Sequence, residues 1–302
     1  MIVQSSSQDC DKVYEQFINA EELCEKNAVF LSSEAMYIQK RNNQCVVHVI
    51  TNEMAIVSMK KQAIHIVGSD DATTCNIVIF GDEKQMLVAH LDQNDQMEFV
   101  LQQWQQTTGA RRDITPVYIV GGYDDEQGIS KPITLSILQA LMNSTCRYCI
   151  ELFVTGPTNT IQCTSHALPK VRGIAYVAGT ESFHPTEFSP ESRLPLIPQR
   201  FLGQSASKMS ILFNDIDSSL PRCQIGPFQS LAFWGEYKML LEYPDEIILK
   251  YTSTSPFAEG AKFVQDIRDT IQYASTHATV PPAITYQPDR TSGTWVPSPT
   301  DP

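Results

Sequence analysis

The sequence predicts one α+β domain, in which helices pack on layered and mainly antiparallel sheets. Short apolar runs follow one another closely between residues 45 and 91, as they do in antiparallel hairpins. Helical stripes occur between and after these runs. No shift in composition divides the chain before residue 276, so residues 1–276 are expected to form a single domain and residues 277–302 a tail.

Length and composition are those of a folded, soluble protein. The 302 residues are 42% hydrophobic and 19% charged, which allows a large core. The formal net charge of −12 argues against a nucleic-acid partner, which would need a basic patch, and it favours a cationic ligand. No apolar run predicts a membrane span, and no secretion signal is recognisable at the start. The eight scattered cysteines therefore indicate free thiols in a reducing cytoplasm.

Strand-like runs account for most of the chain. They are bounded by turn residues, and a double glycine ends the buried run at 117–123. The expected strands are residues 45–50, 54–59, 64–67, 76–80, 85–91, 117–123, 148–154, 172–177, 209–213, 225–228 and 246–251.

Four segments carry the apolar stripe of an amphipathic helix. Asn94 or Asp95 can cap the second helix and Ser130 the third, and Ser255-Pro256 begins the fourth. Beyond Thr276 the chain is rich in proline, so the tail is expected to be extended and partly disordered. The expected helices are residues 9–26, 94–104, 130–141 and 255–273.

The stretch Gly68-Ser69-Asp70-Asp71-Ala72-Thr73-Thr74-Cys75 does not fit a packing role. Small and acidic residues interrupt two apolar runs, and Cys75 begins the second run. A cysteine nucleophile needs a base that takes the thiol proton and a third group that orients the base. If Phe80 pairs with Gln85 across a hairpin, Cys75 lies opposite His90, within reach of a thiol–imidazole hydrogen bond. Cys75 is therefore the candidate nucleophile and His90 the candidate base.

The orienting group has three candidates. Ser69 ends the strand that precedes the motif, and its hydroxyl can hold the second imidazole nitrogen. Asp70 and Asp71 are alternatives for this role, and they can equally bind an ammonium group on a substrate. The simpler interpretations are a core cysteine, a structural histidine and turn-forming aspartates. Backbone N–H groups around Cys75 are the candidate oxyanion hole.

Other motifs carry weaker signals. Cys146-Arg147-Tyr148-Cys149 has no second cysteine pair or histidine cluster, so no metal site is expected. Gly121-Gly122-Tyr123-Asp124-Asp125 is interpreted as a turn near the site rather than a phosphate loop. Arg111-Arg112 is too short for a nucleic-acid patch.

The motif resembles the active-site segment of the eukaryotic protein N-terminal asparagine amidohydrolases. The resemblance continues in order from about residue 45 to residue 273, and the first 40 or so residues depart from it. Its further segments are Val120-Gly121-Gly122-Tyr123, Arg172-Gly173-Ile174-Ala175, Ile225-Gly226-Pro227-Phe228, and Ser253 to Glu259 with Phe263-Val264 and Ile267-Arg268.

The resemblance implies an α-β-β sandwich similar to the cysteine deamidases, with a Cys-His-Ser or Cys-His-Thr triad. Carried onto this sequence, the nucleophile is Cys75, the base His90 and the hydroxyl member Ser69. The implied reaction converts an N-terminal asparagine to aspartate and releases ammonia, which feeds degradation that depends on the N-terminal residue. No metal or organic cofactor is needed. The expected partners are proteins or peptides with a free N-terminal asparagine, and nothing demands more than a monomer.

Substrate-binding candidates are Asp70, Asp71, Thr74 and Tyr123. Selection of asparagine over glutamine depends on one methylene, which is worth about 1–3 kcal/mol in an apolar pocket. Stronger selection therefore needs the α-ammonium group to be fixed, and Asp70 or Asp71 can supply the charge. Two alternatives stay open: a cysteine deamidase acting on internal glutamine or asparagine, and a non-enzymatic adaptor with the same fold.

Overall fold

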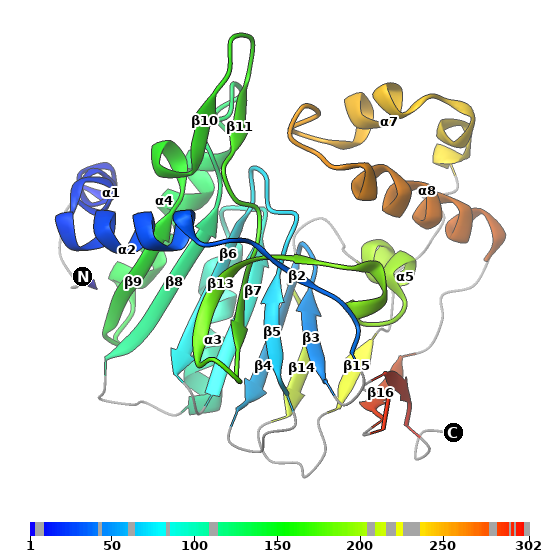
Figure 1. The fold of residues 1–302 in the computed structure, drawn as a ribbon, viewed down its shortest axis with the longest axis horizontal. Helices are drawn as coiled ribbons and strands as arrows, with labels where there is room; N and C mark the ends of the chain where they lie inside the picture. Colours follow the sequence, from blue (N-terminus) through cyan, green and yellow to red (C-terminus); the bar gives the residue numbers. More distant parts are fainter. Residues whose placement is uncertain are drawn as a thin grey trace.

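The chain is built as three layers, one of helices and two of strands (Figure 1). The structure is a computed structural model that describes residues 1–3, 9–41, 44–59, 64–82, 85–108, 114–203, 209–215, 222–225, 236–277, 283–289, 291–292 and 294–298. None of the described helices has the length and apolar character needed to cross a bilayer.

A seven-stranded sheet forms the middle layer. Its hairpin of β6 and β7 lies at the centre, with β8 and β4 on either side. The strands, in spatial order, are β1 (Ile2–Val3), β9 (Tyr148–Val154), β8 (Thr115–Gly121), β6 (Asn76–Asp82), β7 (Gln85–Leu91), β4 (Glu53–Ser58) and β14 (Ser210–Asp215).

A five-stranded sheet forms the second strand layer. Its strands, in spatial order, are β2 (Met36–Ile38), β13 (Ser182–Phe188), β12 (Ile174–Val177), β5 (Ile66–Ser69) and β3 (Val46–Val49). Both sheets are mixed, because β8–β9, β4–β14, β3–β5 and β2–β13 are parallel pairs. The expectation of mainly antiparallel sheets is therefore wrong, while the α+β class is confirmed. The parallel pairs join strands that long connections separate, and short-range sequence patterns do not show such pairs.

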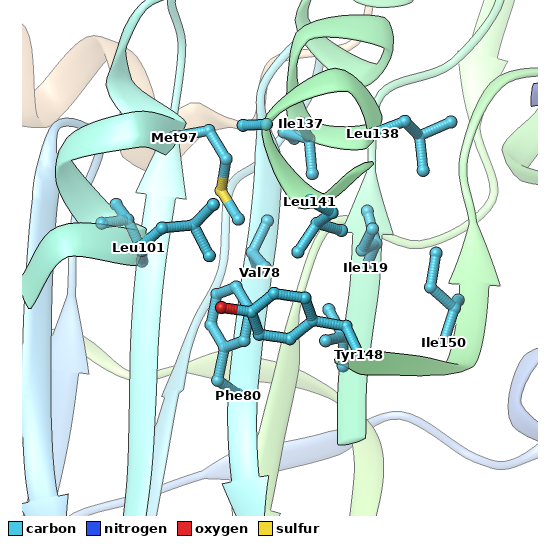
Figure 2. Packing of buried hydrophobic residues seen from close by; sticks show 14 of the residues in the cluster. Val78, Phe80, Met97, Leu101, Ile119, Ile137, Leu138, Leu141, Tyr148 and Ile150 are labelled. Carbon is cyan, nitrogen blue, oxygen red and sulfur yellow. The ribbon is translucent and has the colours of Figure 1, made fainter. Parts of the chain in front are cut away.

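The helices cover the outer face of the seven-stranded sheet. They are α1 (Cys10–Asn19), α2 (Glu21–Ser32), α3 (Gln96–Thr108) and α4 (Ser130–Asn143). Side chains from α3 and α4 pack on Val78, Phe80 and Ile119, as Figure 2 shows. Alternate residues of β6, including Ile77 and Ile79, face the other way and form a second core between the two sheets. This alternation follows from the period of two along a strand.

A C-terminal helical unit lies beside the end of the sheets that carries the β10–β11 hairpin (Figure 1). Its long helix α8 packs on α7 through a core that includes Ile248, Val264 and Ile271. The remaining elements are β10 (Thr160–Gln162), β11 (Ala167–Pro169), α5 (Ile197–Gly203), β15 (Cys223–Ile225), α7 (Asp245–Thr252), α8 (Ala261–Thr276), β16 (Ile284–Pro288), β17 (Trp295–Pro297) and the 3-10 helices Gly156–Asn159, Pro190–Ser192 and Glu236–Glu242.

Several expected elements differ from the structure. The run at 246–251 is helical, because Pro244 at the N-cap and acidic residues in the first turn favour a helix over a strand. The first expected helix is two helices, α1 and α2, which an extended Ala20 separates. The last expected helix begins at Ala261 instead of Ser255. Residues 226–228 of another expected strand lie outside the described residues.

The proline-rich tail contains two strands that join the fold. β16 pairs with β15 and β17, and Tyr286 and Trp295 are buried in the core between the sheets. Trp295 Nε1 donates to the Val46 carbonyl over 3.0 Å. These residues are thus packed on the domain, in contrast to the loose tail that their composition predicts.

Candidate active site

The segment from Gly68 to Cys75 connects the two main sheets. Ser69 is the last residue of β5 in one sheet, and Cys75 directly precedes β6 in the other. Between them, the Ala72 N–H donates to the Arg172 carbonyl over 2.9 Å, and Asp71 has a φ of +60°. A left-handed conformation costs free energy for a residue other than glycine, so tertiary contacts must hold this turn in place.

The glycine pair at the end of β8 holds the backbone of Cys75. The Gly122 N–H donates to the Cys75 carbonyl over 2.7 Å. Gly121 has a φ of +114°, and a Cβ atom at this position would lie 2.5 Å from the same carbonyl oxygen. Only glycine fits such a backbone at this separation. The pair therefore forms the expected turn near the site and fixes where the Cys75 side chain begins.

Ser69 and His90 are in direct contact. Ser69 Oγ lies 2.8 Å from His90 Nδ1 and donates to the Val49 carbonyl over 2.8 Å. A serine hydroxyl can donate one hydrogen bond, and Ser69 donates it to the Val49 carbonyl. Ser69 Oγ must therefore accept from His90 Nδ1–H. This contact leaves His90 Nε2 without a proton, which is the form that a general base requires.

His90 lies on the same face of the sheet as Cys75. The structure pairs His90 with Ile77, and Phe80 with Leu87, so the expected pairing of Phe80 with Gln85 is wrong by two residues. Since side chains alternate with a period of two, a shift of two residues keeps the same face. Cys75 is thus diagonal to His90 rather than directly opposite. His90 Nε2 lies 3.5 Å from Thr51 Oγ1, and Thr51 and Cys75 line one cavity.

Burial keeps the Cys75 thiol and the His90 imidazole neutral at rest. Burial lowers the pKa of His90 to about 4, although Asp70 opposes the shift. Burial also raises the pKa of the Cys75 thiol well above its ordinary value, and the charges of Asp92 and Glu259 raise it further. Both groups therefore stay neutral until another charge or a bound molecule changes their surroundings.

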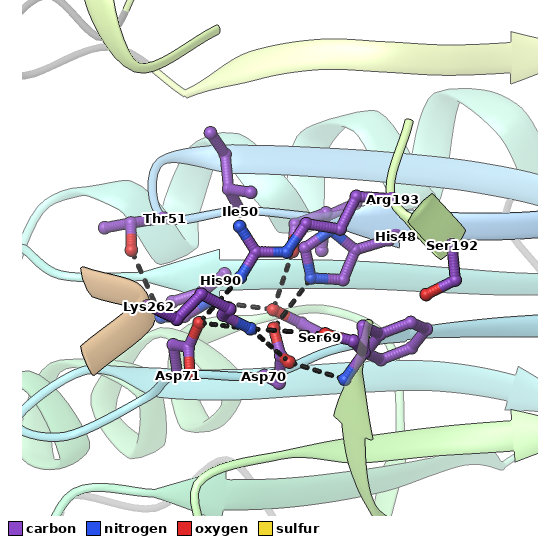
Figure 3. Close-up of polar contacts among 12 residues, drawn as sticks. His48, Ile50, Thr51, Ser69, Asp70, Asp71, His90, Ser192, Arg193 and Lys262 are labelled. Carbon is purple, nitrogen blue, oxygen red and sulfur yellow. Dashed lines mark hydrogen bonds and ion pairs between the residues drawn. The ribbon is translucent and has the colours of Figure 1, made fainter. Parts of the chain in front are cut away.

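Asp70 and Asp71 lie in a cluster of ion pairs (Figure 3). Asp70 contacts His48 Nε2 at 2.8 Å and Lys262 Nζ at 2.9 Å. Asp71 contacts Lys262 Nζ at 2.7 Å and Arg193 Nη2 at 3.1 Å. Both carboxylates line the cavity but are already matched by cations, so a substrate ammonium group would have to displace Lys262 or Arg193 to reach them.

The cavity beside Cys75 has a volume of about 230 Å³. Thr74 lines it, and Thr74 Oγ1 contacts Oγ1 of Thr254, another lining residue, over 2.9 Å. Tyr123 is not among the lining residues; it packs with Ala167 and Ala258. The motif, the loop before α8 and the strand end at Asp92 thus enclose one small chamber around the thiol.

Comparison with known proteins gives one consistent result. The family profile described as "Protein N-terminal asparagine amidohydrolase" matches residues 36–296. This chain belongs to that family. A mouse protein of that name is 28% identical over 269 residues, which cover 85% of this chain and 83% of the mouse protein. A human protein of that name is 28% identical (80% of this chain, 78% of the human protein), and an Arabidopsis one 27% identical (81% and 76%).

Two acidic residues that line the site of this amidohydrolase-family chain were not predicted from the sequence. Asp92 lies just beyond β7 and accepts from Asn52 Nδ2 at 3.0 Å and Gln96 Nε2 at 3.2 Å. Glu259 lies on the loop before α8 and accepts, through Oε1, from Ser253 Oγ at 2.8 Å and Thr73 Oγ1 at 3.3 Å. Neither residue forms an ion pair within the described part of the chain. No sequence pattern marked them, although Glu259 lies in a segment that resembles the family.

Proposed function

We propose that this chain hydrolyses the side-chain amide of an N-terminal asparagine, which yields aspartate and ammonia. The observation that carries the proposal is the Ser69–His90 contact, whose imidazole lies against Thr51 on the wall of the Cys75 cavity, in a chain of the asparagine amidohydrolase family. The order of helices, seven-stranded sheet and five-stranded sheet supports a relation to the wider cysteine deamidases.

In this mechanism His90 Nε2 accepts the proton of the Cys75 thiol as sulfur attacks the carboxamide carbon. The tetrahedral intermediate collapses, its carbon–nitrogen bond breaks, and His90 returns the proton to the leaving ammonia. Water, which His90 deprotonates, then attacks the thioester; the carbon–sulfur bond breaks, His90 returns the proton to sulfur, and the aspartate product leaves, so that Cys75 is again a thiol. Ser69 orients the imidazole throughout. Backbone N–H groups next to Cys75 are proposed to stabilise the oxyanion, and Thr74 lines the wall where the substrate lies.

The physiological setting is proposed on chemical grounds. All eight cysteines are unpaired thiols, which supports a reducing compartment such as the cytoplasm. The substrates are proteins and peptides with a free N-terminal asparagine. The aspartate that forms would then serve degradation that depends on the N-terminal residue. We propose that the monomer is sufficient, because the candidate residues all come from one chain.

Ammonia release tests the proposal directly. Three peptides are compared: one beginning with asparagine, one beginning with glutamine and one carrying asparagine internally. The wild-type protein should release ammonia from the first alone, and Cys75→Ala should abolish the release. Cys24→Ala, at an exposed cysteine, is the matched control and should keep full activity. Absence of release from the asparagine-first peptide would refute the proposed function, and release from the internal asparagine would favour a deamidase of folded proteins.

A further inference from the structure

The substrate of the proposed reaction carries two donor groups close together. Only the α and β carbons separate its ammonium nitrogen from the carboxamide carbon that Cys75 attacks. The group that binds the ammonium must therefore lie on the same small cavity as Cys75. The carboxylates that line this cavity are Asp70, Asp71, Asp92, Glu259 and Asp266.

Three of these carboxylates are matched by cations within the protein. Asp70 and Asp71 share Lys262, and Asp71 and Asp266 share Arg193, which lies 2.6 Å from Asp266 Oδ2. Both terminal nitrogens of Arg193 thus form ion pairs with carboxylates of the protein. Replacing such a pair by a substrate ion pair would expose or strand a buried cation, which costs free energy. The ammonium is better received by a carboxylate that has no cation.

Among the described residues, neither Glu259 nor Asp92 forms an ion pair, although the charge of Arg172 also acts on Glu259. The two carboxylates differ in which oxygens accept hydrogen bonds. Asp92 accepts one amide on each oxygen, at Oδ1 from Gln96 and at Oδ2 from Asn52. Glu259 receives both of its hydroxyl donors on Oε1, and Oε2 has no hydrogen-bond partner in the described part of the chain. A carboxylate accepts well at both oxygens, so Oε2 can accept a further donor when Glu259 is ionised.

The loop that carries Glu259 is fastened to the residues just before the nucleophile. Thr73 Oγ1 donates to Glu259, and Thr74 Oγ1 contacts Thr254 Oγ1. These contacts fix the carboxylate relative to Cys75, whose thiol pKa the charge of Glu259 helps to raise. A fixed separation between acceptor and nucleophile also favours asparagine, because glutamine places its carboxamide one methylene further from the ammonium.

A second buried acceptor faces the same cavity. Although burial opposes its charge, His48 and the Phe188 N–H hold the pKa of Asp70 below its usual value, so Asp70 accepts from His48 Nε2–H. Burial lowers the pKa of His48, which leaves Nδ1 as a bare acceptor. His48 is 1% exposed, lines the cavity, and its Nδ1 has no partner among the described residues. Two residues that line the cavity, His48 and Glu259, thus each have an acceptor without a partner among the described residues, which suits a substrate rich in N–H donors.

We propose that Glu259 binds the α-ammonium group of the substrate's first residue and so restricts the reaction to chain ends. This inference rests on the proposed function. It assigns to Glu259 the ammonium-binding role that was expected of Asp70 or Asp71. Burial and the charge of Asp71 raise the pKa of Glu259 to about 7, although the Ser253 and Thr73 hydroxyls and the charge of Arg172 oppose the shift. A cation beside this carboxylate would stabilise its charged form.

The test compares Glu259→Gln with wild type on two peptides. One begins with asparagine, and the other has the same sequence but lacks the α-amino group. Wild type should prefer the amine-bearing peptide by about 100-fold in kcat/KM, which is typical of a charge pair held away from water. Glu259→Gln should lose most of that preference and should leave kcat/KM for the amine-free peptide within about threefold. Glu259→Asp, which keeps the charge, should lose less than Glu259→Gln. Glu246→Gln, at an exposed carboxylate on α7, should match wild type.

The pH profile separates binding from a structural role. For wild type, kcat/KM on the amine-bearing peptide should rise as Glu259 ionises near pH 7, and this limb should vanish in Glu259→Gln. A variant that loses activity equally on both peptides, or that keeps the full preference for the amine, would overturn the inference and leave the proposed function intact. A wild-type protein that releases no ammonia from asparagine-first peptides would remove both.

Discussion

Replacement of Ser69 by alanine should show how much catalysis depends on the orientation of His90, because the imidazole stays in place but loses its partner at Nδ1. The hydroxyl of Ser69 accepts from His90 Nδ1–H and donates to the Val49 carbonyl, each at 2.8 Å, and the residue is fully buried. Ser69→Ala leaves both partners unpaired. An unpaired buried polar group costs about 1–3 kcal/mol, so the free energy of unfolding should fall by about 2–4 kcal/mol.

The catalytic effect of Ser69→Ala follows from the imidazole tautomer. Without an acceptor at Nδ1, the proton is free to move to Nε2, and the ring is free to turn away from Cys75. We expect kcat to fall about 30- to 300-fold, which corresponds to about 2–3.4 kcal/mol in the activation free energy. KM should stay within about threefold, because Ser69 does not line the cavity.

The assay is ammonia release from an asparagine-first peptide at 25 °C, with urea denaturation of the same preparations. Ser136→Ala on α4 is the matched control, since its hydroxyl donates only to Ile133 in the same helix. It should change neither quantity appreciably. A folded Ser69→Ala protein with a kcat close to that of wild type would show that the hydroxyl does not set the tautomer, and the assignment of His90 Nε2 as the base would then fail.

Three further predictions follow from the protonation and backbone of the site. The pKa of His90 falls from 6.5 in the unfolded state to about 4 in the folded state. Between these two pH values the imidazole is protonated in the unfolded state and neutral in the folded state, so the folded state loses stability as the pH falls. Lowering the pH from 7 to 4 should therefore cost wild type up to about 3 kcal/mol more than His90→Gln in urea denaturation, and an equal loss in both would contradict the shift. Gly121→Ala places a Cβ atom 2.5 Å from the Cys75 carbonyl at a φ of +114°. This variant should lower the free energy of unfolding by about 2 kcal/mol and reduce ammonia release. Unchanged stability would argue against the close approach of Gly121 to the Cys75 carbonyl. Glu259→Gln removes a charge that raises the pKa of Cys75, so iodoacetamide should alkylate Cys75 about threefold faster at pH 8.5. The control Glu246→Gln should react at the wild-type rate. A slower reaction of Glu259→Gln would show that the charge of Glu259 does not raise the pKa of the Cys75 thiol.

The sequence predicted the members of the Ser69–His90 contact because each lies in or beside a short strand with clear alternation. It missed the register of the β6–β7 hairpin by two residues. Gly81 was taken as a loop residue, but with a φ of +116° it continues β6, whose last residue, Asp82, pairs with Gln85. Because the error was an even number of residues, the face of His90 was predicted correctly.

The cations that pair with the acidic residues of the motif could not be predicted from the sequence. Lys262 and Arg193, which neutralise Asp70 and Asp71, are more than 100 residues away along the chain and are brought in by α8 and by the loop after β13. The sequence showed the acidic pair but not its cations, so the pair was expected to be available to a substrate. The availability of Glu259 depends equally on which residues lie near it in the fold.

If Glu259 binds the α-ammonium group as proposed, the distribution of these charges would link recognition of a chain end to activation of Cys75. Internal pairs neutralise Asp70, Asp71 and Asp266, so Asp92 and Glu259 are the carboxylates left to act on the cavity. Both raise the pKa of Cys75, and burial lowers the pKa of His90, so the thiol keeps its proton while these charges stand unopposed. An ammonium group at Glu259 would cancel part of this negative field just as the carboxamide reaches sulfur. An internal asparagine brings no such charge, so it would lack the binding energy and would also meet a nucleophile that is harder to deprotonate. Selectivity for chain ends can therefore arise in the chemical step as well as in binding.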